Sequence, residues 1–201
     1  MKPSEYVKNQ QISESNDFVA IKGRLDDRSI RLLHSAIGLN SELAELIDAI
    51  KKDQIDWVNV AEEAGDCYWY ASVAISEMGI NPEEIMYDDM SEHKIDLLVK
   101  DYESVEQTVA GIGWAAGHLN DCLKKAVFYG KPLDSVKVTA ALGALTFALS
   151  GVCYVSDTTP GVVRERNIAK LKVRYAGKFT AAEASERDLE TERKALEGEK
   201  V

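Results

Sequence analysis

The sequence has little of the glycine and proline that interrupt helices, with 13 glycines and four prolines in 201 residues. Its apolar residues instead recur at helical spacing along almost the whole chain. A sheet-based fold is therefore disfavoured, and we expect an all-α helical bundle. The length suffices to bury a real core, in one domain or two small ones.

Cysteine is equally scarce. Cys67, Cys122 and Cys153 lie in apolar helical runs without metal-binding or redox spacing, which predicts core thiols in a reducing compartment. The N-terminus is polar and shows no signal peptide. We therefore expect a cytoplasmic protein, located in the host cytoplasm if a phage encodes it.

Clustered basic residues are missing too, and the net charge is −10. This balance argues against nucleic-acid binding, which requires clustered lysine and arginine. A small anionic ligand is still compatible, because a metal ion and local lysines can override the overall charge. Residues 138–156 carry no charge and barely reach the length of a membrane span. Their alanine, glycine, threonine and serine content favours a buried core helix over a membrane helix.

Capping and breaking residues divide the chain into segments. Residues 1–24 are expected to be a polar lead-in with order around residues 18–21, residues 25–180 a single domain, and residues 181–201 a charged tail with the spacing of an exposed helix. Helix starts are predicted at Asp26 or Asp27, Asp56, Asn81, Ser104, Asp134 and Thr159, with ends near residues 52, 78, 93–102, 127, 156 and 175.

Two acidic pairs occur at helical spacing in the first half of the chain, Glu42 with Glu45 and Glu63 with Asp66. Residues three apart share a helix face, so each pair points its carboxylates the same way. The link between the two helices is short, which favours antiparallel neighbours and brings the pairs together. Four carboxylates with no nearby histidine or cysteine form a hard oxygen site, suited to Mg²⁺ or Mn²⁺.

Two alternative interpretations of the acids compete with this one. A lone pair of this kind is usually a solvated helix face, but two pairs on adjacent helices in near-apolar surroundings favour a metal site. A dinuclear iron bundle requires Glu-x-x-His on two helices, and the sequence contains no such motif. Magnesium, with manganese as a substitute, is therefore the predicted cofactor.

The chain also contains a weak internal repeat. Aligning Lys51 with Lys124 places Gly38 on Gly111 and, after a short insertion, Asp56 on Asp134, Gly65 on Gly143 and Pro82 on Pro160. At the four acid positions the second copy has Ala115, His118, Ala141 and Ala144. We therefore expect tandem repeats at about 28–100 and 104–178, the second without its acids. Chance similarity between two amphipathic helix pairs is the alternative.

The acids, in the contexts GLNSELAELIDAIKK and NVAEEAGDCYWYAS, resemble the pattern of MazG-like all-α nucleoside triphosphate pyrophosphohydrolases: E-x-x-E, a spacer, then E-x-x-D. Two later segments, LKKAVFYGKPLD and NIAKLKVRYAGKFT, resemble phage-type members, and the resemblance covers about residues 28–196. Family members commonly hold these pieces in one repeat. This chain divides them between two, roughly as the tandem-repeat dimeric dUTPases do.

The resemblance implies Mg²⁺-dependent hydrolysis of a (deoxy)nucleoside triphosphate to the monophosphate and pyrophosphate, in nucleotide-pool remodelling or house-cleaning. It also implies a homodimer or higher homo-oligomer. The implied metal ligands are Glu42, Glu45, Glu63 and Asp66, with Glu45 or Glu63 as the catalytic base. The implied substrate-binding residues are Asn167, Lys170, Arg174 and Tyr175, with Lys51, Lys124 and Lys131 as further candidates that would equally well complement helix dipoles. Trp69 would stack on a base or lie in the core.

A composite site is expected, because the acids occur only in the first copy and the basic segment only after the second. Asn167, Lys170 and Arg174 are spaced by three and four residues and share one helix face. That face meets a triphosphate only if its helix packs beside the first helix pair. The alternative function is a non-catalytic nucleotide-binding, metal-binding or interaction protein on a decayed scaffold, and Mg²⁺-dependent release of pyrophosphate would separate the two.

The substitutions Glu45→Gln and Asp66→Asn are each expected to remove nearly all turnover while leaving the helical fold intact. The amide keeps the shape of the side chain but loses the charge that a divalent ion requires. Steady-state kinetics and far-UV circular dichroism of each variant check this expectation. Full activity in either variant would refute the metal assignment.

Overall fold

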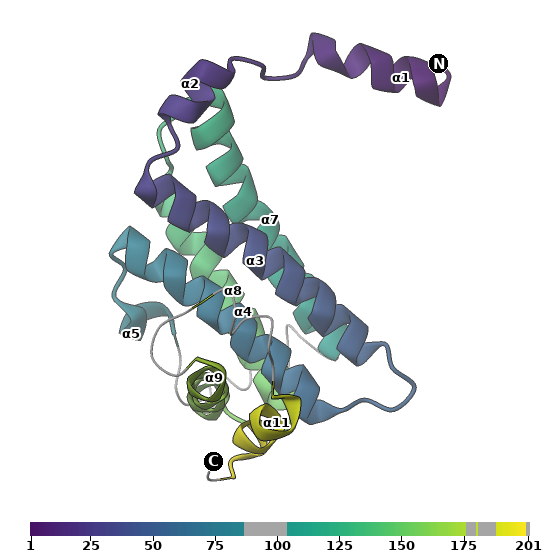
Figure 1. Ribbon diagram of the computed structural model, residues 1–201, viewed down its shortest axis with the longest axis vertical. Helices are drawn as coiled ribbons and strands as arrows, with labels where there is room; N and C mark the ends of the chain where they lie inside the picture. Colours follow the sequence, from purple (N-terminus) through teal and green to yellow (C-terminus); the bar gives the residue numbers. More distant parts are fainter. Residues whose placement is uncertain (87–103, 176–179, 181–187, 200–201) are drawn as a thin grey trace.

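The computed structural model describes residues 1–86, 104–175, 180 and 188–199, and within these residues it contains helices and no strand (Figure 1). The prediction of an all-α fold is confirmed. The elements are α1 (Pro3–Asn9), η1 (Gln10–Ile12), α2 (Phe18–Gly23), α3 (Asp27–Ile50), α4 (Trp57–Met78), α5 (Pro82–Ile85), α7 (Val105–Tyr129), α8 (Ser135–Val155), α9 (Pro160–Arg174) and α11 (Leu189–Glu197).

Local capping explains where the helices begin, and the predicted starts are confirmed. The side chain of Asp56, for example, accepts hydrogen bonds from the amides of Val58 and Asn59, the first unpaired donors of α4. The N-caps of the other principal helices are Asp26, Asn81, Ser104, Asp134 and Thr159. The helix that starts at Pro82 ends already at Ile85, where Met86 is extended, so the prediction of one helix from there towards residues 93–102 is wrong at this point. Residues 87–103 lie outside the described residues.

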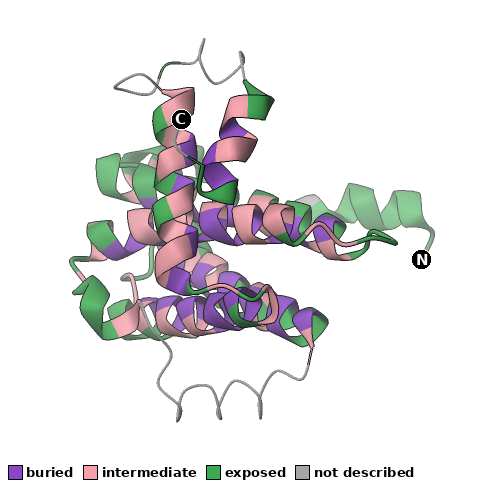
Figure 2. Cartoon of the chain, turned by 90° about the horizontal axis from the view of Figure 1, so that it is seen from below, coloured by how far each residue is buried: buried purple, intermediate pink, exposed green. Residues whose placement is uncertain are grey.

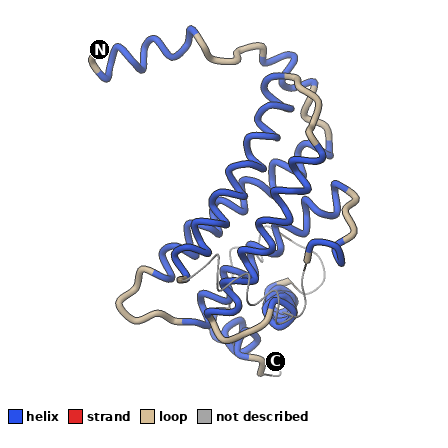
Figure 3. The backbone as a smooth tube through the Cα atoms, turned by 180° about the vertical axis from the view of Figure 1, so that it is seen from behind, coloured by secondary structure: helices blue, strands red, loops and turns tan. Residues whose placement is uncertain are grey.

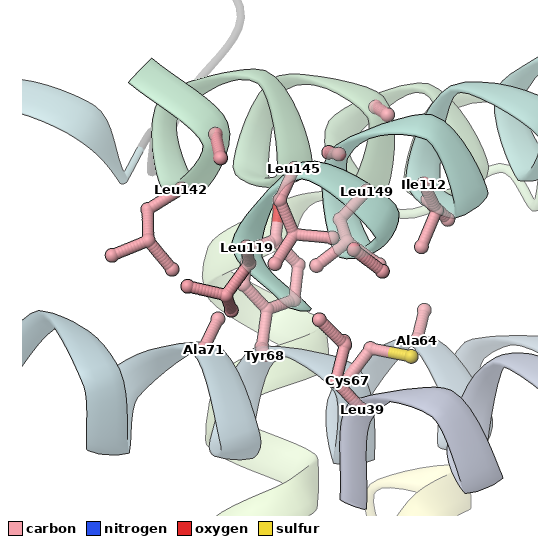
Figure 4. Close-up of a cluster of buried hydrophobic side chains, with 14 of the residues drawn as sticks. Leu39, Ala64, Cys67, Tyr68, Ala71, Ile112, Leu119, Leu142, Leu145 and Leu149 are labelled. Carbon is pink, nitrogen blue, oxygen red and sulfur yellow. The ribbon is translucent and has the colours of Figure 1, made fainter. Parts of the chain in front are cut away.

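Four long helices form the body of the molecule. Helices α3 and α4 pair as one antiparallel hairpin and α7 and α8 as another, with α3 packed on α7 and α4 packed on α8. Their facing side chains build one core, drawn in Figure 4, that includes Leu39, Tyr68, Ile112, Leu119, Leu145 and Leu149. The hydroxyl of Tyr68 lies 3.2 Å from the carbonyl oxygen of Thr146 and 3.2 Å from Oγ of Ser150, so this ring joins the two hairpins by polar contacts as well.

Helix α8 contains the uncharged run. It is the one helix in the described parts of the chain that is long and apolar enough to cross a membrane, and 61% of its most apolar window is buried inside the bundle. Val138, Leu142, Leu149 and Val152 are fully buried in the core, where α8 packs against α7 and α4. This burial agrees with the expectation of a core helix, because core helices of bundles have the same composition.

The two terminal segments differ from the expectations. Helix α1 lies in the segment expected to be ordered only around residues 18–21, buries no residue and projects from the bundle (Figure 3). The charged tail is helical as predicted, but the expectation of an exposed helix is wrong. Glu192, Ala195 and Leu196 of α11 are buried, because α11 packs against α9. By contrast, the helix next to the N-terminus is coloured as exposed in Figure 2. The small apolar face of α11 was not recognised in the sequence because most of its residues are charged.

Expressing residues 1–96 and 104–201 as separate fragments is expected to leave neither fragment stably folded. Each hairpin alone would expose the apolar face that it buries against the other, and so small a remaining core rarely supports a fold. Thermal melts followed by circular dichroism check this, and mixing the two fragments should restore a cooperative transition. Two fragments that each melt cooperatively at the temperature of the intact chain would disprove a shared core.

Candidate functional site

Three of the four predicted metal ligands converge at one place. Carboxylate oxygens of Glu42 and Glu45 on α3 and of Glu63 on α4 all lie within 4.8 Å of one another. The spacing of three residues sets Glu42 and Glu45 on one face of α3, and the antiparallel partner supplies Glu63. Glu63 is buried and Glu42 half-buried, whereas Glu45 is exposed. A hydrogen bond from Nδ2 of Asn59 to Oε1 of Glu63, at 3.2 Å, orients the buried carboxylate.

The fourth acid, Asp66, is engaged differently. Its Oδ1 accepts a hydrogen bond from Nδ2 of Asn167 at 2.6 Å, and its Oδ2 accepts one from Nζ of Lys170 at 2.5 Å. Nζ of Lys170 also lies 3.2 Å from Oε1 of Glu62. Lys170 is completely buried, so its charge is neutralised by these two carboxylates within the protein. The predicted group of four acids is therefore a cluster of three beside one internal ion pair. Asp66→Asn is accordingly expected to lower the stability of the fold as well as turnover, because it removes part of the compensation of the buried Lys170.

Gly65 favours the close approach of α9 to α4 at this contact. A Cβ added to Gly65 would lie 3.0 Å from Cβ of Asn167 and 3.1 Å from its Nδ2, closer than ordinary contact. The absence of a side chain at Gly65 therefore lets α9 approach α4 closely enough for Asn167 to reach Asp66. The sequence predicted that α9 packs beside the first helix pair, and the contacts between α9 and α4 agree.

The acid cluster has more negative charge than its surroundings compensate. Burial raises the pKa of Glu63 to about 8, and the neighbouring carboxylates Glu62 and Asp66 add to this shift. Burial likewise raises the pKa of Glu42 to about 7, with Asp66 and Glu45 contributing and the cations Lys170 and Arg174 opposing. Both carboxylates therefore retain protons near neutral pH unless a cation joins them.

The acids line a cavity of about 790 Å³, within the range of small-molecule sites. The lining residues are His34, Glu42, Glu45, Glu62, Glu63, Asp66, Trp69, Tyr70, Ile168, Leu171, Lys172, Arg174 and Tyr175. The acids come from α3 and α4, while the last turns of α9 supply the basic side chains. The cavity thus has an acidic wall and a basic wall that lie more than a hundred residues apart in the sequence.

Three rings border the acidic wall. The ring centroid of Tyr70 lies 4.9 Å from that of Trp69 and 5.5 Å from that of His34, both edge-to-face. Gly38 leaves the room for Tyr70, because a Cβ there would lie 2.0 Å from the ring. His34 lines the wider cavity but lies outside the carboxylate cluster, which contains acids alone as expected. His34, Gly38 and Glu42 recur every four residues, a helical spacing that could have indicated this shared face.

The predicted substrate-binding residues of α9 divide into two groups. Arg174 and Tyr175 line the cavity, but Asn167 and Lys170 do not and instead bind Asp66. Lys172, which sequence reasoning missed, also lines the cavity. Ile168, Leu171, Lys172 and Tyr175 form a stripe at helical spacing, which was the available indication.

The remaining predicted lysines lie elsewhere. Lys51, Lys124 and Lys131 are exposed and do not line this cavity. Nζ of Lys124 forms an ion pair with Asp121 at 2.8 Å, and Lys51 caps the C-terminus of α3. Complementing helix ends, the alternative given for these lysines, agrees better with their positions.

The residues present fit a divalent cation of the magnesium type. Three carboxylates within reach of one point supply the hard oxygen donors that Mg²⁺ and Mn²⁺ prefer. Burial, with the neighbouring carboxylates, makes the ionised forms of Glu42 and Glu63 unfavourable and raises their pKa values, and a bound divalent ion would stabilise those forms. Within α7 and α8, the positions that the predicted repeat aligns with the four acids hold Ala115, His118, Ala141 and Ala144, which do not form such a ligand set.

Comparison with models of protein families, with curated proteins and with solved structures finds no match for this chain. The site is therefore interpreted from its own residues and geometry.

Without divalent ions, the free energy of unfolding is expected to fall as the pH rises from about 5 through 8. Glu42 and Glu63 bind protons more tightly in the folded protein than in the unfolded chain, so the stability that they contribute is lost once they ionise. Mg²⁺ or Mn²⁺ should restore more stability at pH 8.5 than at pH 5.5. Thermal midpoints measured with EDTA and with each ion check both statements.

The substitution Glu63→Gln should remove much of this pH dependence, whereas Glu165→Gln, at an exposed position on α9, should leave it unchanged. An equal shift of the thermal midpoint by divalent ions at both pH values would contradict the interpretation that Glu42 and Glu63 bind the ion in their ionised forms.

Proposed function

We propose that this chain hydrolyses a nucleoside triphosphate to the monophosphate and pyrophosphate, using a divalent cation. The observation that carries the proposal is the two-sided cavity, in which a cluster of three carboxylates faces Arg174 and Lys172 beside a group of aromatic rings. A nucleoside triphosphate is complementary to this cavity. Its phosphates bind both divalent cations and basic side chains, and its base is a flat π-system that can stack on aromatic rings.

The acidic wall would hold Mg²⁺, or Mn²⁺ in its place, through Glu42, Glu45 and Glu63. A divalent ion there would neutralise phosphate charge and lower the pKa of the water that attacks phosphorus. Glu45 or Glu63 would take the proton from that water. Glu63 suits this role because a hydrogen bond from Asn59 orients its carboxylate.

Lys170 and Asn167 support this wall by binding Asp66 rather than the ligand. Without Lys170, the carboxylates of Asp66 and Glu62 would repel the cluster beside them. The proposed role of Lys170 is therefore to hold Asp66 in place. The geometry favours this role over direct contact of Lys170 with a triphosphate, because direct contact would require the buried ion pair to open.

The basic wall would bind the phosphates that leave as pyrophosphate. Arg174 offers a planar guanidinium, which matches two phosphate oxygens at once, and Lys172 offers a mobile point charge. Trp69, Tyr70 and His34 would contact the nucleoside, because edge-to-face rings leave faces and edges available for a base. The acidic charge near these rings makes entry of a triphosphate without a cation unfavourable.

The proposal includes the finer description of the fold as two MazG-like repeats, of which only the first retains the site. The two hairpins contact each other through equivalent helices, α3 with α7 and α4 with α8. Ala115 and Ala141, aligned with Glu42 and Glu63, are buried in the core. Replacement of acids by alanine would convert a ligand-binding face into a packing face, which supports decay of one copy.

The proposal is tested by incubating the protein with a panel of ribo- and deoxynucleoside triphosphates and Mg²⁺, and by separating the products. We expect the monophosphate and pyrophosphate in equal amounts, with activity abolished by EDTA and restored by Mg²⁺ or Mn²⁺. The variant Arg174→Lys should lower kcat/KM. The corresponding loss of transition-state stabilisation is expected to be about 1.5–3 kcal/mol, which is typical of a hydrogen bond to a charged group. Lys137→Ala, which removes an exposed ion pair with Asp134, serves as the control.

Release of orthophosphate in place of pyrophosphate would contradict the proposed reaction. Metal-dependent nucleotide binding without any turnover would instead favour the non-catalytic alternative.

A further inference from the structure

Arg174 lies between the cavity and helix α11. Its side chain lines the cavity, and its Nε and Nη2 donate hydrogen bonds to Oε1 and Oε2 of Glu192, at 3.0 and 2.6 Å. Glu192 is 2% exposed and does not line the cavity. A bidentate contact of this kind fixes both the position and the plane of the guanidinium.

Helix α11 is itself firmly attached to the elements that carry the site. Ala195 and Leu196 are buried, and α11 packs along α9. Arg193 donates to both carboxylate oxygens of Asp56, at 2.6 and 3.1 Å, and Asp56 is the residue that caps α4. The carboxylate of Glu192 is therefore held in a fixed relation to the helix that bears Glu63 and Asp66.

A carboxylate that binds a ligand-binding arginine can act in two ways. It can compete with the ligand for the guanidinium, or it can orient the guanidinium towards the ligand. A guanidinium has five N–H donors, and the contact through Nε and Nη2 uses two of them. The edge that carries Nη1 remains on the other side from Glu192. Tyr175, which also lines the cavity, shares a side-chain hydrogen bond with Arg174. These contacts restrain the guanidinium from two sides without occupying all of its donors, which favours orientation.

We propose that Glu192 is a positioning residue of the site, which holds Arg174 so that the guanidinium edge opposite Glu192 binds the anionic end of the ligand. This inference rests on the proposed function, because it assumes a phosphate ligand in the cavity. Glu192 thereby links the charged C-terminal helix to ligand binding, although no atom of that helix lines the cavity.

The test compares the full-length protein with Glu192→Gln, Glu192→Asp and Arg193→Gln. Arg193→Gln is the matched control, because it removes the other ion pair that fastens α11 and leaves the contact with Arg174 intact. We measure KM and kcat for the best triphosphate, the inhibition constant of pyrophosphate, and Mn²⁺ binding without nucleotide. Glu192→Gln should raise KM and the inhibition constant by about tenfold and change kcat by less than about threefold, as expected when one phosphate contact is misaligned.

Mn²⁺ binding should be unchanged in all variants, and Glu192→Asp, which keeps the charge, should recover part of the lost affinity. If Glu192→Gln does not fold, Glu192→Asp measured against Arg193→Gln still decides the matter, with a raised KM expected only for the former. Equal changes of KM in the Glu192 and Arg193 variants would reduce Glu192 to a structural contact and overturn the inference. A lowered KM in Glu192→Gln would also overturn it, since Glu192 would then compete with the ligand.

The proposed function can fail separately from this inference. If the unaltered protein neither hydrolyses nucleotides nor binds pyrophosphate with Mn²⁺, both are wrong. If it hydrolyses nucleotides while Glu192→Gln behaves like the unaltered protein, only the inference is wrong. If it binds pyrophosphate with Mn²⁺ without turnover, and Glu192→Gln weakens that binding about tenfold, only the proposed reaction is wrong.

Discussion

The buried contact of Lys170 with Asp66 and Glu62 is the interaction on which the rest of the site depends. It fastens α9 to α4 and so brings the basic end of α9 to the acidic hairpin. A buried ion pair stabilises poorly on average, but loss of either partner leaves an uncompensated charge and costs about 3–5 kcal/mol. The pair therefore makes the approach of α9 specific, because any other register would leave Lys170 buried without a partner. Gly65 permits this register by leaving space for Asn167.

This arrangement also explains the distribution of charge in the cavity. Lys170 compensates Asp66 and Glu62, which are the acids nearest α9, and leaves Glu42, Glu45 and Glu63 with little compensation from the protein. A fully compensated cluster would have little affinity for a divalent ion, whereas five uncompensated acids would destabilise the fold. Under the proposed function, the division into one internal ion pair and one under-compensated cluster would combine binding of an ion with stability of the fold.

Most of the helical architecture could be predicted from the sequence, because helix starts depend on local capping. Asp56 and Asn81 cap the amides two or three residues ahead, and such a contact is visible in a short segment. The convergence of Glu42, Glu45 and Glu63 followed from helical spacing and a short link. The contacts of Asp66 with Lys170, and of Arg174 with Glu192, join segments whose distance in space no local pattern specifies. For the same reason the sequence did not distinguish the buried Lys170 from Lys172, which lines the cavity.

The position of α11 shows why a charged segment need not be a solvated tail. Its burial on α9 involves few apolar atoms, mainly from Ala195 and Leu196, and so hydrophobic contact alone holds it weakly. Two bidentate pairs, Arg174 with Glu192 and Arg193 with Asp56, supply the directional part of the attachment. One of these pairs ends at the cavity and the other at the cap of α4. The two ion pairs join α11 to both α9 and the start of α4. Helix α11 thus adds a second connection between the helices that carry the two walls, beside the direct contact of Lys170 with Asp66 and Glu62.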